Sequence, residues 1–216
     1  MSSRERILER IRRGQGRGGA APGGEERDLV REYLRAHPRG PLPAVDADLV
    51  ARFADRAAAL ASTVDFVADE RDVPATVARY LDAHRLPRSG CVWPVLSRLD
   101  WAAAGLSLAA RAASGDDAVG VTGVFCALAE TGTLCVLSGA GTPSSASLVP
   151  ETHVAIVAAS RIVAHMEDAW DLMRTELGQL PRAVNYVSGP SRTADIEQTV
   201  VLGAHGPARV HIVIIR

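Results

Sequence analysis

The sequence predicts an α/β fold with a mostly parallel sheet, and three observations lead to this prediction. Between residues 46 and 93 helical and strand patterns alternate, which is the rhythm of a parallel sheet connected by helices. From residue 118 onward, short apolar runs separated by glycine, proline and small polar residues replace that alternation. Glu130 is the only charged residue between 118 and 150, and such uncharged runs are typical of buried strands.

The chain begins with a helix and a glycine-rich linker. Ser2 and Glu5 have the spacing of a capping box, in which each side chain bonds the backbone of the other residue. Glycines from residue 14 to 24 end this helix. We therefore expect an N-terminal helical appendage over 1–24 and an α/β domain over 25–216. The first 40 residues hold ten arginines and six acids, which favours a solvated helix that docks on a partner or on its own domain over a nucleic-acid contact.

The hydrophobic period and the helix-breaking residues predict the other elements. Further helices are expected at 25–36, 46–61, 74–84 and 168–177, with Asp46 as the cap of the second of these and Pro74 opening the third. Strands are expected at 63–68, 90–93, 120–129, 133–137, 153–158, 183–187 and 210–215.

Composition excludes several classes of enzyme. The chain contains no lysine, so all 24 of its Lys and Arg residues are arginines. Schiff-base aldolases and pyridoxal-phosphate enzymes need a lysine amine, Walker phosphate loops end in Gly-Lys-Ser/Thr, and protein kinases need a strand lysine. None of these chemistries is open to this sequence. The formal net charge of −1 also argues against a general nucleic-acid binder.

The cysteine usage and the lack of a visible leader predict a cytoplasmic protein. No basic segment followed by an apolar stretch opens the sequence, and Gly, Ser, Thr and Pro interrupt the uncharged stretch 118–150 too often for a membrane span. Cys91, Cys126 and Cys135 lie in apolar surroundings without CxxC spacing, which predicts buried thiols in a reducing compartment.

The lone charge at Glu130 is the first candidate for chemistry. It lies in the string Ala-Glu-Thr-Gly-Thr, where a tight turn between two strands is the simplest interpretation. A carboxylate in such apolar surroundings needs hydrogen bonds or a ligand, so Glu130 is a candidate acid, base or nucleophile, with Thr131 and Gly132 beside a substrate. The alternative is an exposed turn that Glu130 merely caps.

The segment 188–197, Ser-Gly-Pro-Ser-Arg-Thr-Ala-Asp-Ile-Glu, is the second candidate. It follows a predicted strand and is expected to enter a short helix, whose free N–H groups would favour an anion. Arg192 could hold a carboxylate or phosphate through two parallel hydrogen bonds. The candidate anion-binding residues here are Ser188, Gly189, Ser191, Arg192, Thr193, Asp195 and Glu197. A polar turn with a surface arginine is the alternative.

A third string, Gly-Ala-His-Gly-Pro, places His205 between Gly203 and Gly206. Histidine titrates near neutral pH, so His205 is a candidate general base, and the two glycines would allow a ligand to approach the backbone. A loop histidine bonded to a backbone carbonyl is equally open. The six histidines show no metal-ligand spacing, so we expect no metal site and no cofactor bound by this chain.

Taken together, these strings resemble those of the lactate-utilisation protein C family, which is built on the LUD domain. The resemblance is strongest over residues 118–216. It implies a mostly parallel, doubly wound sheet of the type found in ribose-phosphate isomerases, glucosamine-phosphate deaminases and CoA transferases. It also implies cytoplasmic action with two iron–sulfur partner proteins in the oxidation of L-lactate to pyruvate. One departure is the Ser-rich segment 144–147, where many relatives have a Gly-Arg pair.

Three functions follow from the residues and the resemblance together. In the first, the chain is a component of lactate utilisation that binds a small organic anion at the 188–193 turn, with Arg192 on its carboxylate and Glu130 or His205 facing its hydroxyl or reactive carbon. The second is an enzyme of the CoA-transferase or isomerase type that uses Glu130. The third is a small-molecule sensor without catalysis.

Overall fold

The computed structural model describes residues 1–16, 21–194 and 200–216, and these form two compact units. The first unit, Met1–Leu42, contains α1 (Ser3–Gly14) and α2 (Gly24–Ala36). The expected capping box is present, because the Ser2 side chain accepts from the Glu5 backbone and the Glu5 carboxylate accepts from the Ser2 backbone. Neither helix contains a buried residue. The predicted division after residue 24 places α2 with the larger domain and stays a prediction.

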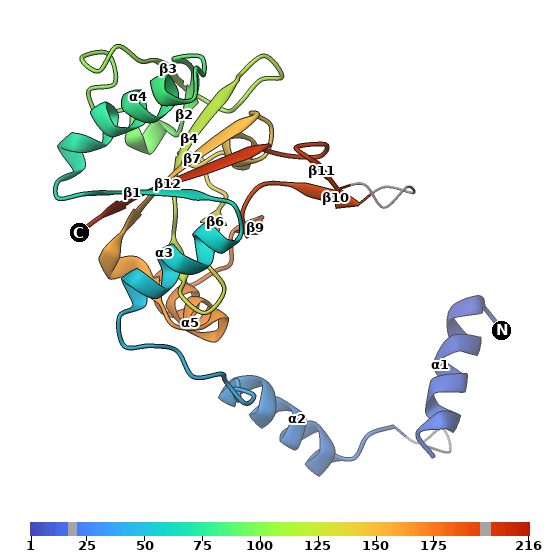
Figure 1. Ribbon diagram of the computed structural model, residues 1–216. Helices are drawn as coiled ribbons and strands as arrows, with labels where there is room; N and C mark the ends of the chain where they lie inside the picture. Colours follow the sequence, from blue (N-terminus) through green and yellow to red (C-terminus); the bar gives the residue numbers. More distant parts are fainter. Residues whose placement is uncertain (17–20, 195–199) are drawn as a thin grey trace. The chain divides into compact units, whose positions relative to one another are not determined.

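The second unit, Pro43–Arg216, is built on a six-stranded sheet whose neighbouring strands are all parallel. Its strands, in spatial order, are β1 (Thr63–Val67), β12 (Arg209–Ile215), β7 (Thr152–Ala158), β4 (Val119–Gly123), β2 (Ser89–Val92) and β3 (Ser107–Ala110) (Figure 1). The central strands are buried nearly throughout, as parallel strands covered on both faces must be. The predicted α/β class with a mostly parallel sheet is confirmed.

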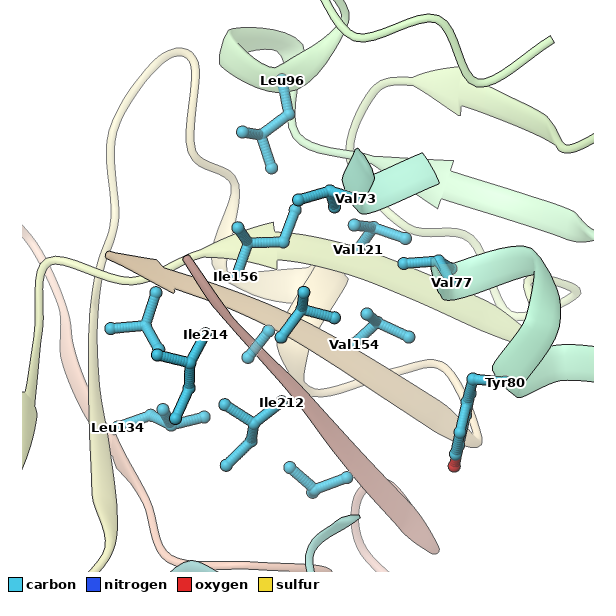
Figure 2. Packing of buried hydrophobic residues seen from close by; sticks show 14 of the residues in the cluster. Val73, Val77, Tyr80, Leu96, Val121, Leu134, Val154, Ile156, Ile212 and Ile214 are labelled. Atoms are coloured by element: carbon cyan, nitrogen blue, oxygen red, sulfur yellow. The ribbon is translucent and has the colours of Figure 1, made fainter. Parts of the chain in front are cut away.

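Helices cover this sheet and complete its core. α3 (Leu49–Ala59) and α4 (Val73–Ala83) flank β1 on opposite sides (Figure 1), and short 3-10 helices occupy Glu70–Asp72, Pro94–Leu96, Ser144–Ser147 and Ala159–Arg161. The main core joins Val73 and Val77 of α4 to Val121, Val154 and Ile212 of the sheet (Figure 2). Burial of a side chain of this size stabilises the fold by about 1.5–3 kcal/mol.

A second, mixed sheet lies outside the main sheet and carries its own small core. Its strands, in spatial order, are β8 (Ile162–Val163), β5 (Cys126–Leu128), β6 (Thr133–Leu137) and β9 (Val184–Val187). α5 (Met166–Leu177) covers it, with Ala169 and Met173 packed on Leu128. Cys126 and Cys135 face each other across β5 and β6 as buried free thiols.

Three sequence-based expectations were wrong in detail. The run 120–129 is two strands in two sheets, because the Val124 N–H still bonds Ile156 of β7 whereas the Phe125 N–H bonds Cys135 of β6. Asp48, not Asp46, caps α3 by accepting from the Ala51 N–H at 3.0 Å.

The third error concerns the segment after residue 188. Residues 192–194 form β10 (Arg192–Ala194), which pairs antiparallel with β11 (Val200–Leu202), where the sequence predicted the start of a helix. Whether this segment forms a helix or a strand depends on pairing with residues farther along the chain, and the local sequence does not indicate that pairing.

Two histidines are buried in the main sheet as neutral groups. His153 of β7 is fully buried, with Nε2 2.8 Å from the Thr122 hydroxyl. His211 of β12 contacts the Thr63 hydroxyl through Nδ1 at 2.8 Å and stacks on Tyr80 with ring centroids 3.8 Å apart. Burial disfavours the imidazolium form and lowers the pKa of each histidine from 6.5 to about 4.

These pKa values predict loss of stability on mild acidification. The unfolded chain takes up protons at these histidines below about pH 6.5, before the folded chain does, so the free energy of unfolding falls as pH drops toward 4. Between pH 7 and pH 5 each histidine should lower the free energy of unfolding by about 2 kcal/mol. Urea unfolding of the wild type and His153→Gln at both pH values measures this. The variant should lose about 2 kcal/mol less than the wild type on acidification; an equal loss would refute the assignment of this effect to His153.

Candidate functional site

The two most distinctive strings of the sequence meet at the C-terminal end of α3. Gly132, in the turn between β5 and β6, has φ +69°, and a Cβ there would lie 2.4 Å from the backbone nitrogen of Ala57. Gly189, after β9, has φ +77°, and a Cβ there would lie 2.3 Å from the Leu60 carbonyl oxygen. Only glycine combines this backbone conformation with so close an approach. Both turns therefore pack directly on the α3 backbone.

A chain of hydroxyl groups joins the two turns to each other. The Thr131 hydroxyl donates to the Thr133 hydroxyl at 2.8 Å, and Thr133 Oγ1 lies 2.7 Å from Ser188 Oγ. The structure thus brings the turn that holds Glu130, Thr131 and Gly132 next to Ser188 and Gly189.

Arg192 reaches the same place but contacts the protein itself. Its Nη2 donates to the Leu60 carbonyl at 2.9 Å, where the C-terminal end of α3 carries the negative end of the helix dipole. Residues 192–194 form a strand, so up to Ala194 this segment offers no helix N-terminus to an anion. The turn also borders the amino end of β12, because the Ser191 N–H donates to the Pro207 carbonyl. It therefore does not lie at the carboxyl ends of the main parallel strands, where the sequence predicted it to lie.

A cavity of about 420 Å³ lies beside these turns. Its lining consists of Pro43, Arg52, Arg56, Ala59, Leu60, Glu130 and Thr131. Arg52 approaches Asp46 at 3.3 Å, yet its Nε is buried without a hydrogen-bond partner. In the described part of the chain the Arg56 side chain forms no ion pair or hydrogen bond. Two arginines and one glutamate thus line the cavity, and one of the arginines keeps a buried Nε without a partner among the described residues.

Glu130 is held by a histidine that the sequence did not single out. Its Oε2 lies 2.9 Å from Nδ1 of His165, the residue that precedes α5. The backbone supports both residues, because the Glu130 N–H donates to the Ala164 carbonyl and the His165 N–H donates to the Asp168 carboxylate. The contact gives the carboxylate a partner, as the isolated charge in an apolar run led us to expect.

The remaining predicted residues lie elsewhere. Gly203, His205 and Gly206 line a different cavity of about 430 Å³ together with Asp116 and Glu151. Thr193 pairs with Val201 in the β10–β11 hairpin, and Asp195 and Glu197 lie outside the described residues. The structure does not place His205 in the cavity that Glu130 lines.

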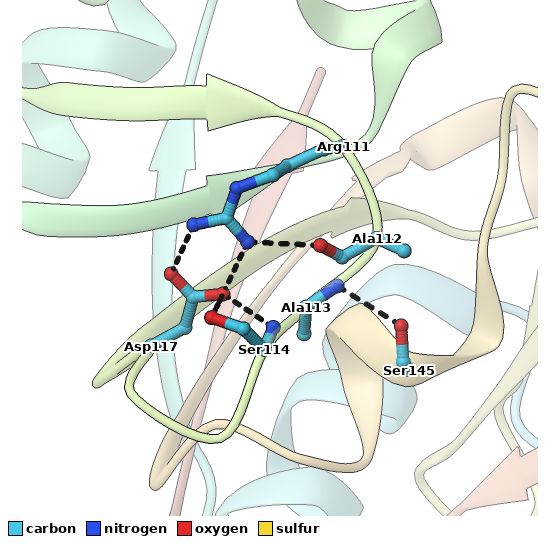
Figure 3. Close-up of polar contacts among 6 residues, drawn as sticks. All are labelled: Arg111, Ala112, Ala113, Ser114, Asp117 and Ser145. Atoms are coloured by element: carbon cyan, nitrogen blue, oxygen red, sulfur yellow. Dashed lines mark hydrogen bonds and ion pairs between the residues drawn. The ribbon is translucent and has the colours of Figure 1, made fainter.

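The second cavity is bordered by a closed ion pair. Arg111 contacts both oxygens of Asp117 at 2.6 and 2.9 Å, and the Ser114 N–H also donates to Asp117 (Figure 3). The Arg111 guanidinium is the main cause that lowers the pKa of Asp117 to about 2. The Ser145 hydroxyl accepts from the Ala113 N–H at 3.0 Å, so the Ser-rich segment supports this loop.

Sequence reasoning missed Arg52, Arg56 and His165. A signal for the two arginines was present, since their i, i+4 spacing places them on one face of the expected helix 46–61. Nothing local marked His165, whose partner lies 35 residues earlier in the chain. In the ranges that the structure describes, no group of three His, Cys, Asp or Glu residues is placed to hold a metal ion. No described helix is long and apolar enough to cross a bilayer.

Comparisons with known proteins agree with this architecture. The family model of the LUD domain matches residues 50–215. The chain is similar to Lactate utilization protein C of Bacillus subtilis (39% identical over 100 residues, 45% of this chain and 42% of that protein). It is also similar to Lactate utilization protein C of Shouchella clausii (40% over 99 residues, 45% of this chain and 43% of that protein). The matched region thus spans less than half the length of these relatives.

A solved structure shows the same fold. The crystal structure of a DUF162 family protein from Deinococcus radiodurans superposes with a TM-score of 0.59 at 19% identity. The match covers 81% of this chain and 100% of that chain. At this identity the likeness concerns the fold alone.

The contact between Gly132 and α3 predicts a measurable loss of stability. Gly132→Ala adds a Cβ against the backbone of Ala57, whereas Gly178→Ala, at nearly the same positive φ of +66°, adds it in open space. The control variant should lower the free energy of unfolding by about 1 kcal/mol, from backbone strain alone. Gly132→Ala should lower it by about 2 kcal/mol more, because its Cβ overlaps the α3 backbone. Urea unfolding midpoints of the two variants measure the difference. Equal losses would contradict the close packing of this turn on α3.

Proposed function

This chain belongs to the LUD domain family, and on that premise we propose that it is a cytoplasmic component of L-lactate utilisation that binds a small organic anion in the α3 cavity. The 188–193 turn adjoins this cavity, because Gly189 and Arg192 both contact Leu60, which lines it. The bound group would be a carboxylate of the size of lactate or pyruvate.

The buried Nε of Arg52, together with the neighbouring Arg56, carries this proposal. A buried donor without a partner costs about 1–3 kcal/mol, so Arg52 Nε favours a state in which a ligand oxygen accepts from it. Arg56 lines the same cavity one helical turn away. Two guanidinium groups on one helix face suit a carboxylate, which accepts several such hydrogen bonds at once.

The names of the similar proteins support the choice of pathway. Both relatives described above are called lactate utilization proteins, and each is similar over 99 or 100 residues of this chain. We propose that the chain acts beside two iron–sulfur proteins that carry the electrons from lactate. With three cysteines it has too few thiolates for a four-cysteine cluster of its own, so we propose that it binds no redox cofactor.

A second function is favoured by the position of Glu130. Its carboxylate lines the cavity, where it could attack a bound acyl-CoA thioester and form a glutamyl anhydride with release of the CoA thiolate. Mass spectrometry of the protein after incubation with short acyl-CoAs tests this transferase function. An adduct on Glu130 that is lost in Glu130→Gln would favour it, and absence of any adduct would exclude a glutamyl intermediate from these substrates.

We expect Arg56→Gln to weaken anion binding without unfolding the chain, because Arg56 is exposed and makes no other polar contact in the described part of the protein. Loss of a charged hydrogen bond should reduce affinity for L-lactate or pyruvate about tenfold or more. Isothermal titration calorimetry measures this. Arg174→Gln is the matched control, since Arg174 pairs with Asp171 on the surface of α5 and does not line the α3 cavity. Equal affinity of Arg56→Gln and the wild type would exclude the α3 cavity.

We expect a complex with the two iron–sulfur proteins that depends on the N-terminal unit. Large apolar side chains are exposed on both of its helices: Ile7, Leu8, Ile11, Leu29, Val30, Tyr33 and Leu34. Exposed apolar groups in such number are typical of protein contact surfaces. Co-purification after co-expression should succeed with the wild type and with Arg35→Asp but fail with Leu34→Asp. If the wild type forms no complex with these proteins at micromolar concentration, the proposed subunit function loses its support.

A further inference from the structure

We propose that His165 is a positioning residue that holds Glu130 as a hydrogen-bond acceptor, so that the α3 cavity selects carboxylates bearing a hydroxyl group over those bearing an oxo group. The inference rests on the proposed anion binding and adds to it a rule of specificity and a residue responsible for it. It follows from the arrangement of donors and acceptors around the cavity.

The Glu130–His165 pair is held in place from several sides. Glu130 lines the cavity with a side chain that is 28% exposed, and its partner His165, which is not part of the lining, is 13% exposed. Glu130 follows β5 and His165 follows β8, which are parallel neighbours in register at Leu128 and Val163. The Glu130 N–H donates to the Ala164 carbonyl at 3.0 Å and the His165 N–H to Asp168 Oδ2 at 2.8 Å.

This geometry determines what the carboxylate offers a ligand. A carboxylate accepts hydrogen bonds only, so His165 Nδ1 carries the proton in its 2.9 Å contact with Glu130 Oε2. In the described part of the chain the other oxygen, Oε1, has no hydrogen-bond partner. Glu130 therefore retains one oxygen that can accept a hydrogen bond from a ligand. His165 restricts rotation of the carboxylate and so keeps this oxygen available to the cavity.

The arginines offer the opposite kind of group. Guanidinium groups can only donate hydrogen bonds, and Arg52 and Arg56 both line the cavity with Glu130. Arg52 already donates to Asp46 through Nη1 at 3.3 Å, but its Nε has no partner in the described ranges. A 2-hydroxy acid can place its carboxylate on the arginines and donate its hydroxyl proton to Glu130. A 2-oxo acid has no proton to donate and sets its oxygen lone pairs against the carboxylate. A site built around a hydrogen bond strongly rejects an analogue that lacks the donor.

Calorimetric titration of the full chain with L-lactate, pyruvate and propionate tests this rule. The wild type should bind L-lactate about tenfold or more tightly than pyruvate or propionate. Glu130→Gln, which is nearly isosteric, provides both an N–H donor and a carbonyl acceptor, so lactate and pyruvate should then bind within about threefold of each other.

A pair of variants isolates the role of His165. Asparagine can place an amide N–H near the position of Nδ1, so His165→Asn should keep the preference for lactate, whereas His165→Leu should lose most of it. Circular dichroism and the urea midpoint of each variant show whether it is folded. The preference is a ratio of two affinities measured on the same sample, so a partial loss of folded protein does not change it.

The outcomes separate this inference from the proposed function. Binding of all three acids with equal affinity by the wild type would overturn the rule of specificity and leave anion binding intact. An unchanged preference in Glu130→Gln or in folded His165→Leu would overturn the role of that residue. Failure of the wild type to bind any carboxylate at millimolar concentration would overturn the proposed anion site and, with it, this inference.

Discussion

The close contact of two glycine turns with the C-terminal end of α3 is the constraint on which the site depends. Gly132 and Gly189 approach the backbone of Ala57 and Leu60 at distances that no side chain allows. The two turns come from different strands of the mixed sheet, so the contact joins that sheet to α3 over a wide separation in sequence. As a consequence the arginines of α3 and the carboxylate of Glu130 share one cavity.

The passage of the chain from one sheet to the other brings Glu130 to this position. Val124 still bonds the main sheet and Phe125 already bonds the mixed sheet, so the change occurs within two residues. β5 then runs beside β8, and the residues that follow these two strands lie next to each other. The contact between Glu130 and His165 is thus a result of strand pairing. Nothing in the sequence around either residue indicates that the other one is its partner.

The arginines of this lysine-free chain differ in what they contact. Several form two-point contacts with carboxylates, as Arg98 does with Glu70, Arg111 with Asp117 and Arg161 with Glu176. These guanidinium groups are already neutralised by a neighbour and have little left to offer an anion. Arg52 and Arg56 differ, because one keeps a buried unsatisfied N–H and the other forms no polar contact in the described ranges. Other described arginines, such as Arg85 and Arg182, also lack a side-chain partner, so what sets Arg52 and Arg56 apart is their position beside Glu130 in one cavity.

The sequence by itself determined the α/β class and the positions of most helices and strands, and it singled out Glu130 and the 188–193 turn as candidates for chemistry. Hydrophobic period and glycine placement suffice for this, because they depend on residues a few positions apart. Only the tertiary structure decided that residues 192–194 form a strand and that the run 120–129 divides between two sheets. It also decided that Arg52 and Arg56 line a cavity with Glu130 and that His165 contacts Glu130. These outcomes depend on contacts between residues far apart in the chain. Hydrophobic periodicity shows which face of a helix or strand is buried, but it does not show which other element packs against that face.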